Sequence, residues 1–247
     1  MKKTNYSYVG IAFIILVFGI MFIPKIVNRL KNDDVVRSER TKDINSNSGK
    51  PSHQMTFLEI EGKPKKVPEF SFVDQNGDTI SNKDYLGKVY VVEFFFTTCP
   101  SICPKMNANL IQVQEAFKDY KNFGVASFTI NPEHDTPEVL KAYADKYGVV
   151  NPNWHLMTGD KDVIYDLANK GFNIFAGENP EVAGGFEHSG NFALIDKKGY
   201  IRSRKDDFGN PMIFYNGIIS ESEQVDDEGQ KQEISKLKED IEILLNE

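Results

Sequence analysis

The chain has 247 residues, of which 40% are hydrophobic, and it carries a formal net charge of −7. This length and apolar content predict one sizeable globular domain with additional segments, and the acidic balance argues against nucleic acid as a partner. The two cysteines are too few for a disulfide-dense scaffold.

The first predicted element is a membrane-spanning helix. Residues 6–23 contain no charged side chain, and Pro24 and Lys25 end the run. This is about the length that crosses a bilayer as a helix. No cleavage site of small residues follows it, so the pattern favours an uncleaved signal anchor over a signal peptide. Basic residues flank the run on both sides, and the charges therefore do not decide its orientation.

The predicted anchor divides the chain into four parts. Residues 1–5 precede it, and residues 24–66 form a polar linker of mixed charge with several Asn, Ser and Gly residues. Residues 67–247 form the folded domain, which ends in a helix. A short strand at 56–60 is predicted where the linker meets the domain.

Strand and helix patterns alternate through the domain. Asn76 and Gly77 form a turn between strands at 70–73 and 79–80, which predicts a β-hairpin. The later elements, in chain order, are a central strand (89–96), a helix to about 120, a strand (123–130), a helix from the Thr136 cap to Gly148, a strand (154–157), a helix from Asp160 to about 170, a glycine-rich loop (171–190), a second hairpin (191–196 and 200–204), an acidic stretch (221–229) and a final amphipathic helix (234–244). This order predicts an α/β, thioredoxin-like fold, with a mixed β-sheet flanked by helices.

The two cysteines lie where the central strand gives way to a helix. Cys99 is expected in the loop and Cys103 at or next to the helix N-cap, with Pro104 at the first helical position. Unpaired backbone N–H groups and the helix dipole favour thiolates there. The spacing allows a redox disulfide, an ordinary structural disulfide, or a clamp of two thiolates on a soft metal ion. Spacing alone does not decide among these three.

A histidine would add a third ligand to a two-thiolate metal site. Of the four histidines, His53 lies in the linker, His134 lies in a polar turn, and His155 lies in an apolar strand as a core residue. His188 ends the glycine-rich loop just before a strand, at a junction that faces the cysteine loop in thioredoxin-like folds. The glycines of 171–190 favour mobility, so this loop is expected to close over the cysteines when His188 binds metal.

Four motifs in this order resemble those of the Sco/SenC family of membrane-anchored copper chaperones: TTCPSICPKM, TINPEHDTPEVLKAYADKYG, LMTGDKDVIYDLA and EHSGNFALIDKKG. The resemblance spans about 68–219. It implies a thioredoxin fold outside the cytoplasm and copper bound by both cysteines and a histidine. By motif position the copper ligands are Cys99, Cys103 and His188, and the same two cysteines would form the redox disulfide. This donor set suits Cu(I), with Cu(II) as a second oxidation state.

Three residues near these ligands raise further questions. The family often has Asp where this chain has Ser101 between the cysteines, and usually has Asp where Glu187 precedes the histidine. Neither change removes a ligand, but residues that support the ligands tune a metal site. Glu93 lies six residues before Cys99 in the apolar strand. It is either a buried acid of the kind that thioredoxins carry at this offset, or an edge or solvent-facing residue.

The resemblance implies a non-enzymatic copper chaperone that serves the assembly of the Cu(A) centre of cytochrome c oxidase. The implied partners are the copper-bearing subunit of the oxidase and an upstream copper donor or thiol reductant. The chain would be a single-pass protein of the inner membrane, with residues 1–5 cytoplasmic and the domain on the periplasmic side. The alternative is a thiol–disulfide oxidoreductase that reduces cysteines of a partner protein, with Cys99 or Cys103 as nucleophile.

Overall fold

A computed structural model of the chain describes residues 55–205 and 210–247. The predicted anchor at 6–23, His53 and most of the predicted linker lie outside the described residues. Within the described part, no helix combines the length and apolar character that a membrane span requires. These residues belong to one structural unit, Ser52–Glu247.

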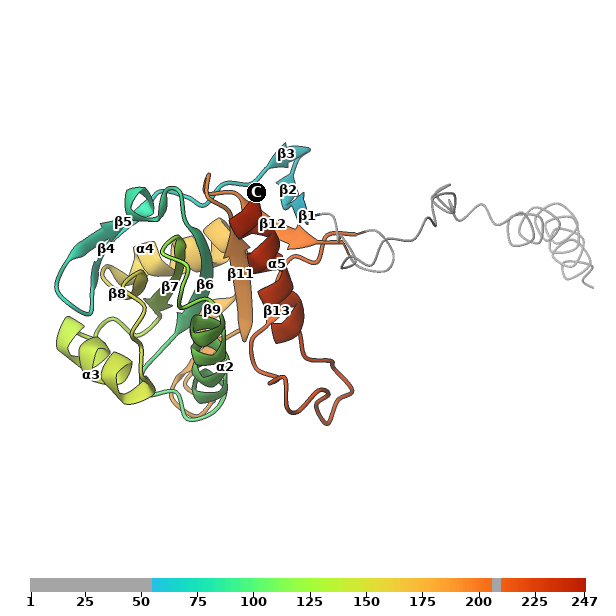
Figure 1. Ribbon diagram of the computed structural model, residues 1–247. Coiled ribbons are helices and arrows are strands. Elements are labelled where there is room, and N and C mark those ends of the chain that lie inside the picture. The colour runs from blue at the N-terminus through green and yellow to red at the C-terminus, as the bar shows by residue number, and fades with distance from the viewer. Residues whose placement is uncertain (1–54, 206–209) are drawn as a thin grey trace, which may run out of the picture. The chain divides into compact units, whose positions relative to one another are not determined.

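The sheet is built around β6 (Val89–Phe95), in which every residue is buried. β-Branched and aromatic residues favour strands, and a continuous apolar run is typical of a strand covered on both faces. β6 pairs in parallel with β7 (Phe123–Thr129), and β7 pairs in parallel with β8 (Trp154–Thr158). On its other side β6 pairs antiparallel with β11 (Asn191–Ile195) (Figure 1). This central position places the residues that follow β6 at the carboxyl end of the parallel strands, where open α/β sheets bind ligands.

The outer strands extend the sheet on both sides. The described strands lie in the order β1, β12, β11, β6, β7, β8, β4, β5, with β13 beside β11. Both predicted hairpins of the main sheet are present. The outer strands are β1 (Met55–Phe57), β4 (Ser71–Asp74), β5 (Thr79–Ser81), β12 (Ile201–Arg204) and β13 (Tyr215–Asn216), and a small separate hairpin is formed by β2 (Glu59–Ile60) and β3 (Lys63–Pro64).

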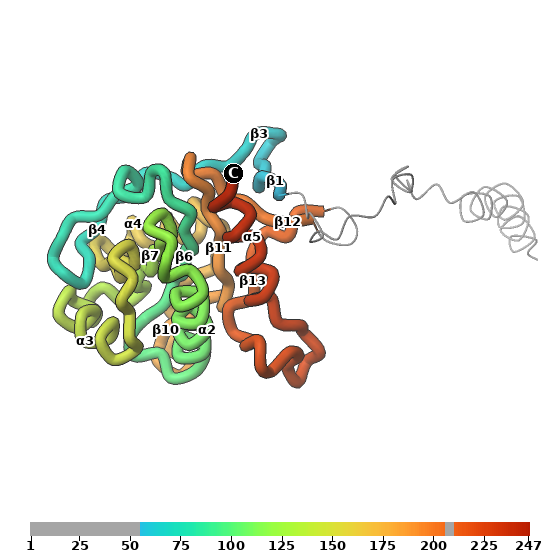
Figure 2. The backbone as a smooth tube through the Cα atoms, viewed as in Figure 1, coloured from blue at the N-terminus to red at the C-terminus, as the bar shows by residue number. Residues whose placement is uncertain are grey.

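The helices cover both faces of this sheet. α2 (Ile102–Ala116) contacts both α3 (Pro137–Tyr147) and α5 (Ile234–Asn246), and Figure 2 shows the three on one side. α4 (Lys161–Asp166) continues into a π-helix, η2 (Leu167–Phe172), and lies behind the sheet in Figure 1. A short 3₁₀ turn, η1 (Asn82–Tyr85), precedes β6. A mixed sheet with helices on both faces confirms the predicted thioredoxin-like fold.

Helix caps agree with the sequence prediction at two helices. The Thr136 side chain accepts a hydrogen bond from the Val139 N–H, and Gly148 ends α3 with φ 77°. The Asp160 side chain caps α4 in the same way, accepting from the Val163 N–H.

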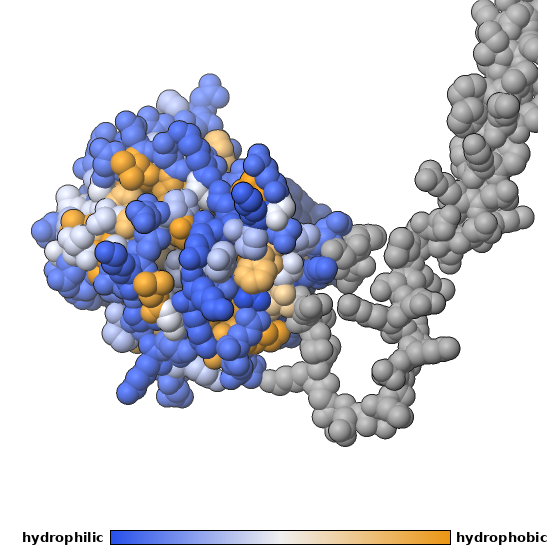
Figure 3. Space-filling view, turned by 90° about the horizontal axis from the view of Figure 1, so that it is seen from above, coloured by the Kyte–Doolittle hydropathy of each residue, from blue (hydrophilic) through white to orange (hydrophobic). Residues whose placement is uncertain are grey.

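The face seen in Figure 3 is largely hydrophilic with scattered apolar residues, as is usual for a surface in contact with water.

Two details of the prediction are wrong. α2 begins at Ile102, so Cys103 and Pro104 both lie inside its first turn. The first four N–H groups of a helix have no intrahelical partner, and proline therefore fits the third position as well as the first. The 171–190 segment contains a β-hairpin of β9 (Ala176–Glu178) and β10 (Phe186–His188), which we call the histidine hairpin. Its strands are too short to produce a clear period-two pattern.

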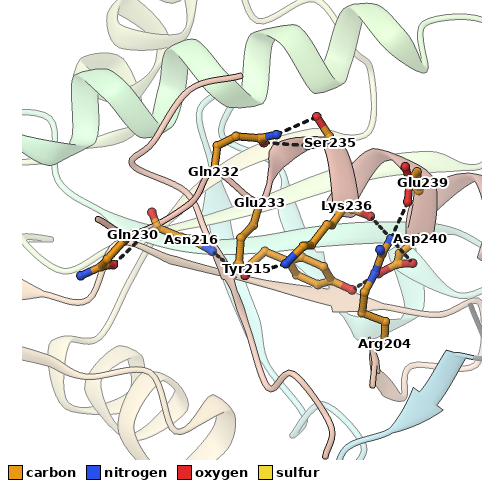
Figure 4. A network of polar contacts seen from close by, with 10 residues as sticks. All are labelled: Arg204, Tyr215, Asn216, Gln230, Gln232, Glu233, Ser235, Lys236, Glu239 and Asp240. Atoms are coloured by element: carbon orange, nitrogen blue, oxygen red, sulfur yellow. Dashed lines mark hydrogen bonds and ion pairs between the residues drawn. The ribbon is translucent and has the colours of Figure 1, made fainter. Parts of the chain in front are cut away.

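A buried ion pair holds the C-terminal helix against the sheet (Figure 4). The Nε and Nη2 atoms of Arg204 each donate to the Asp240 carboxylate over 2.9 Å, and the Tyr215 hydroxyl donates to it over 2.6 Å. Asp240 is fully buried, so its charge depends on these partners. The network fixes α5 and β13 together. Gly217, the residue directly after β13, donates its N–H to the Gly190 carbonyl over 2.7 Å. The C-terminal region therefore supports the backbone two residues after His188.

Candidate metal centre

Cys99, Cys103 and His188 lie together in space, with one donor atom of each within 4.8 Å of the others. Cys103 Sγ lies 3.1 Å from His188 Nε2, although the two residues are 85 positions apart. The Cys103 backbone N–H donates to Cys99 Sγ over 3.5 Å. Both cysteines are free thiols. Cys103 lies in the first turn of α2 and His188 ends β10, so this contact brings the two elements together.

A buried carboxylate anchors the loop that leads to Cys99. Asp135, which is fully buried, accepts a hydrogen bond from the Thr97 backbone N–H over 3.0 Å. The hydroxyls of Thr97 and Thr129 also donate to Asp135. The role of Asp135 cannot be predicted from the sequence, because it depends on a contact across 38 residues that no local motif reveals.

The other described histidines have different partners. His134 Nδ1 lies 2.8 Å from Asp135 Oδ1, and the His134 side chain is half-exposed. His155 Nδ1 lies 2.8 Å from Asp74 Oδ2, as expected for a core histidine with a satisfied polar atom. Of the three histidines in the described part of the chain, His188 alone joins the cysteines. Its Nδ1 lies 3.2 Å from the Ser189 carbonyl oxygen. A proton on Nδ1 directed at that carbonyl leaves the Nε2 lone pair free to bind a metal.

The two thiols differ in acidity. A hydrogen bond with Cys103 is the largest influence that lowers the pKa of Cys99, and bonds from His188 and from backbone N–H groups add to it. The pKa of Cys103 is raised by the hydrogen bond with Cys99 and by burial. The two shifts have opposite directions because the sulfurs share a hydrogen bond, in which the pair keeps one proton. Binding a metal to both sulfurs must release that proton.

Glu93 is a buried acid, not an edge residue. It lies in the middle of β6 and is completely inaccessible to solvent. The Ser127 hydroxyl donates to Glu93 Oε1 over 2.6 Å, and the Trp154 indole N–H donates to that hydroxyl over 2.9 Å. Glu93 Oε2 has no hydrogen-bond partner among the described residues. Burial raises the pKa of Glu93 to about 7, and a charge on Glu93 also raises the pKa of Cys103.

Glu187 lies at the mouth of the site but bonds elsewhere. Its carboxylate accepts a hydrogen bond from Asn179 Nδ2 over 3.0 Å. Glu187 is exposed, whereas His188 is buried. Both residues line a cavity of about 200 Å³ that also exposes Cys99 and Phe186. A larger cavity of about 370 Å³ beside Tyr200 contains no cysteine or histidine.

The three donors fit a soft metal ion. Two sulfurs and one imidazole nitrogen are the ligand types that Cu(I) prefers. A closed structural zinc site needs four protein ligands, and the metal-ligand cluster among the described residues has three. The site can therefore hold a soft ion through protein donors alone, and Cys99 lines the cavity beside it.

Comparisons with known proteins agree with this geometry. The SCO1/SenC family model matches residues 59–220. The SCO1 protein homolog of Bacillus subtilis is 32% identical over 158 residues, which cover 63% of this chain and 80% of that protein. The structure of BsSco, described as a member of the Sco family of cytochrome c oxidase assembly proteins with a disulfide switch, has a TM-score of 0.57 at 26% identity, covering 72% of this chain and 92% of that one. Copper-bound ScoI of Bradyrhizobium japonicum shares the fold, with a TM-score of 0.54 at 21% identity, covering 73% of this chain and 99% of that one. The chain belongs to the SCO1/SenC family.

Proposed function

We propose that this protein binds one copper ion through Cys99, Cys103 and His188 and delivers it for assembly of the Cu(A) centre of cytochrome c oxidase. The observation that carries this proposal is the gathering of two sulfurs and an imidazole nitrogen within 4.8 Å of one another. The family supports it, since the related BsSco is described as a cytochrome c oxidase assembly protein and the related ScoI binds copper. The copper-bearing subunit of the oxidase is the proposed recipient.

The acidity of the two thiols suggests an order for copper exchange. The Cys99 thiolate, which lines the cavity, meets copper first and displaces a ligand of the donor. Cys103 then loses its proton and binds, and His188 Nε2 completes the site. Delivery runs the same steps in reverse, so that an incoming thiolate of the partner replaces Cys99. Soft thiolate ligands on both proteins allow copper to move without release into water.

The direct test is to measure copper and free thiols together on protein purified after exposure to Cu(I). A chaperone should hold one copper per chain, and both thiols should be recovered when a chelator removes the metal. A protein that holds no copper and has lost both thiols to a disulfide would contradict the proposal.

A thiol–disulfide oxidoreductase is the second candidate function, and it is favoured by the buried Glu93, whose charge raises the pKa of Cys103. In this reaction the Cys99 thiolate attacks a disulfide of the partner protein and forms a mixed disulfide. Cys103 then loses its proton and attacks Cys99 Sγ, which releases the second partner thiol. The partner is reduced by two electrons, and this chain is left with a Cys99–Cys103 disulfide. Copper binding and this disulfide exclude each other, because the disulfide leaves no thiolate for the metal.

We also propose that residues 6–23 anchor the chain in the inner membrane. The uncharged run supports the anchor, and the family resemblance supports a periplasmic domain with residues 1–5 in the cytoplasm and 24–66 as linker. Protease added to the outer face of spheroplasts should digest the domain and leave a cytoplasmic control protein intact. Full protection of the domain, with digestion of a known periplasmic control, would overturn this topology.

A further inference from the structure

The histidine hairpin does not belong to the main sheet. β9 and β10 form their own two-stranded sheet, and an isolated two-stranded hairpin is only marginally stable in water. The position of His188 therefore depends on contacts between this hairpin and its surroundings. One such contact, between Lys161 and Glu178, is an ion pair whose partners are partly exposed, and surface ion pairs contribute little.

The Asn169 side chain makes the stronger contact with the hairpin. Its Oδ1 accepts a hydrogen bond from the Ala176 backbone N–H over 3.2 Å, and its Nδ2 donates to the Ala176 carbonyl over 2.9 Å. Nδ2 also donates to the Tyr165 carbonyl over 3.0 Å. One side-chain amide thus satisfies both backbone groups of a strand residue, as a neighbouring strand would.

Ala176 lies directly opposite His188 in the hairpin. Since both backbone polar groups of Ala176 bond to Asn169, they face away from β10. Ala176 and His188 are then a non-hydrogen-bonded pair, the kind in which opposing side chains come closest. Phe175 and Ser189, the next pair after Ala176 and His188, are a hydrogen-bonded pair, because the Ser189 N–H donates to the Phe175 carbonyl over 3.0 Å. Asn169 therefore braces the hairpin at the residue that faces the third ligand.

The local backbone explains how Asn169 reaches this position. It lies in η2 (Leu167–Phe172), a π-helical turn that follows α4. Such turns are rare and occur often at functional sites. The turn ends at Asn173, which has φ 58°, and the Ile174 N–H returns to the Ala168 carbonyl over 2.9 Å. The chain thus folds back on itself, and Ala176 passes beside the Asn169 amide.

We propose that Asn169 is a positioning residue that holds the His188 imidazole beside Cys103, so that little ordering is needed when copper binds. This inference rests on the proposed copper site. Asn169 would act through His188 and not on the metal itself. Its effect on copper should therefore vanish when His188 is absent, whereas its effect on the metal-free hairpin should remain.

The test compares Asn169→Asp with a matched variant, Asn153→Asp. Both asparagines donate through Nδ2 to backbone carbonyls, and Asn153 donates to those of Lys121 and Phe123. Asn153 directly precedes β8, at the opposite end of the parallel strands from the cysteines. Asn169→Asp should weaken Cu(I) binding about tenfold, the value of one or two hydrogen bonds. It should also speed hydrogen exchange at the Ser189 N–H in metal-free protein, and Asn153→Asp should change neither.

A double-mutant comparison separates positioning from general destabilisation. In a His188→Ala background, Asn169→Asp should cause no further loss of Cu(I) affinity. An equal loss in both backgrounds, or unchanged exchange at Ser189, would overturn the inference. If Asn169→Asp does not fold, Asn169→Ala removes both Nδ2 donations and also the bond that Oδ1 accepts, without adding a charge. If the proposed copper site itself is wrong, the result is different: His188→Ala alone should leave the Cu(I) affinity unchanged. In that case hydrogen exchange at the Ser189 N–H still measures the effect of Asn169 on the hairpin.

Discussion

Cys99→Ser or Cys103→Ser should weaken Cu(I) binding by more than about 100-fold, beyond the range expected for a residue that merely supports a ligand. Each change leaves one thiolate and one imidazole, and a serine hydroxyl is a hard, weak donor for a soft ion. His188→Ala should weaken binding less, because both thiolates remain. It should not unfold the domain, since His188 lies at the end of a short hairpin outside the main sheet. Competition with a chromophoric Cu(I) chelator measures all three affinities on one scale.

Ser101→Ala is the matched control for these variants. Ser101 lies between the cysteines, and its Oγ is 3.8 Å from Cys99 Sγ, but it offers no soft donor atom. Its removal should leave one copper per chain and change the affinity by less than about tenfold. If the double variant with serine at both cysteine positions still held one copper tightly, the ligand assignment would be wrong.

The hairpin changes the expected cost of assembling this site. A loop of glycines that orders on binding would lose about 1–2 kcal/mol of conformational entropy per ordered residue. In the structure, His188 Nε2 lies 3.1 Å from Cys103 Sγ. Phe186 packs on Phe96 with ring centroids 5.2 Å apart, which adds an apolar contact to the polar brace at Asn169. These contacts predict that the 171–190 segment loses less conformational entropy on binding copper than a loop of glycines would.

Local patterns in the sequence predicted most of the fold. The Asn76–Gly77 turn, the Thr136 and Asp160 caps and the apolar run of β6 each depend on neighbouring residues, and the structure has all of them. The two cysteines were recognisable from their place after a buried strand. His188 needed the family motif, because its contact with Cys103 crosses 85 residues.

The residues that support the site could not be predicted in the same way. Asp135 and Asn169 act through hydrogen bonds to Thr97 and Ala176, and both occur in polar segments where an exposed side chain is the usual expectation. For Glu93 the sequence allows either burial or exposure, since an acid in an apolar strand fits both. The strand order decided it, because β6 has a paired strand on each side and helices cover both faces.

The buried carboxyl of Glu93 should make stability depend on pH. Burial raises its pKa from 4.5 to about 7, so between these values the folded protein binds a proton that the unfolded chain has released. The stabilisation is complete below pH 4.5 and is lost as pH rises through about 7. Relative to Glu93→Gln, the wild-type free energy of unfolding should fall by about 2–3 kcal/mol between pH 5 and pH 8. Urea denaturation of the metal-free proteins at several pH values measures this difference.

Ser127→Ala provides a positive control for Glu93. The Ser127 hydroxyl lowers the pKa of Glu93 by donating to it, so its removal should move the midpoint of the pH effect upward. A difference between wild type and Glu93→Gln that is constant with pH would show that the carboxyl does not titrate in this range. Glu93 is not a proposed ligand, so Glu93→Gln should still bind one copper per chain. Glu93→Gln thus removes the titrating carboxyl that favours the oxidoreductase alternative, while copper binding is retained.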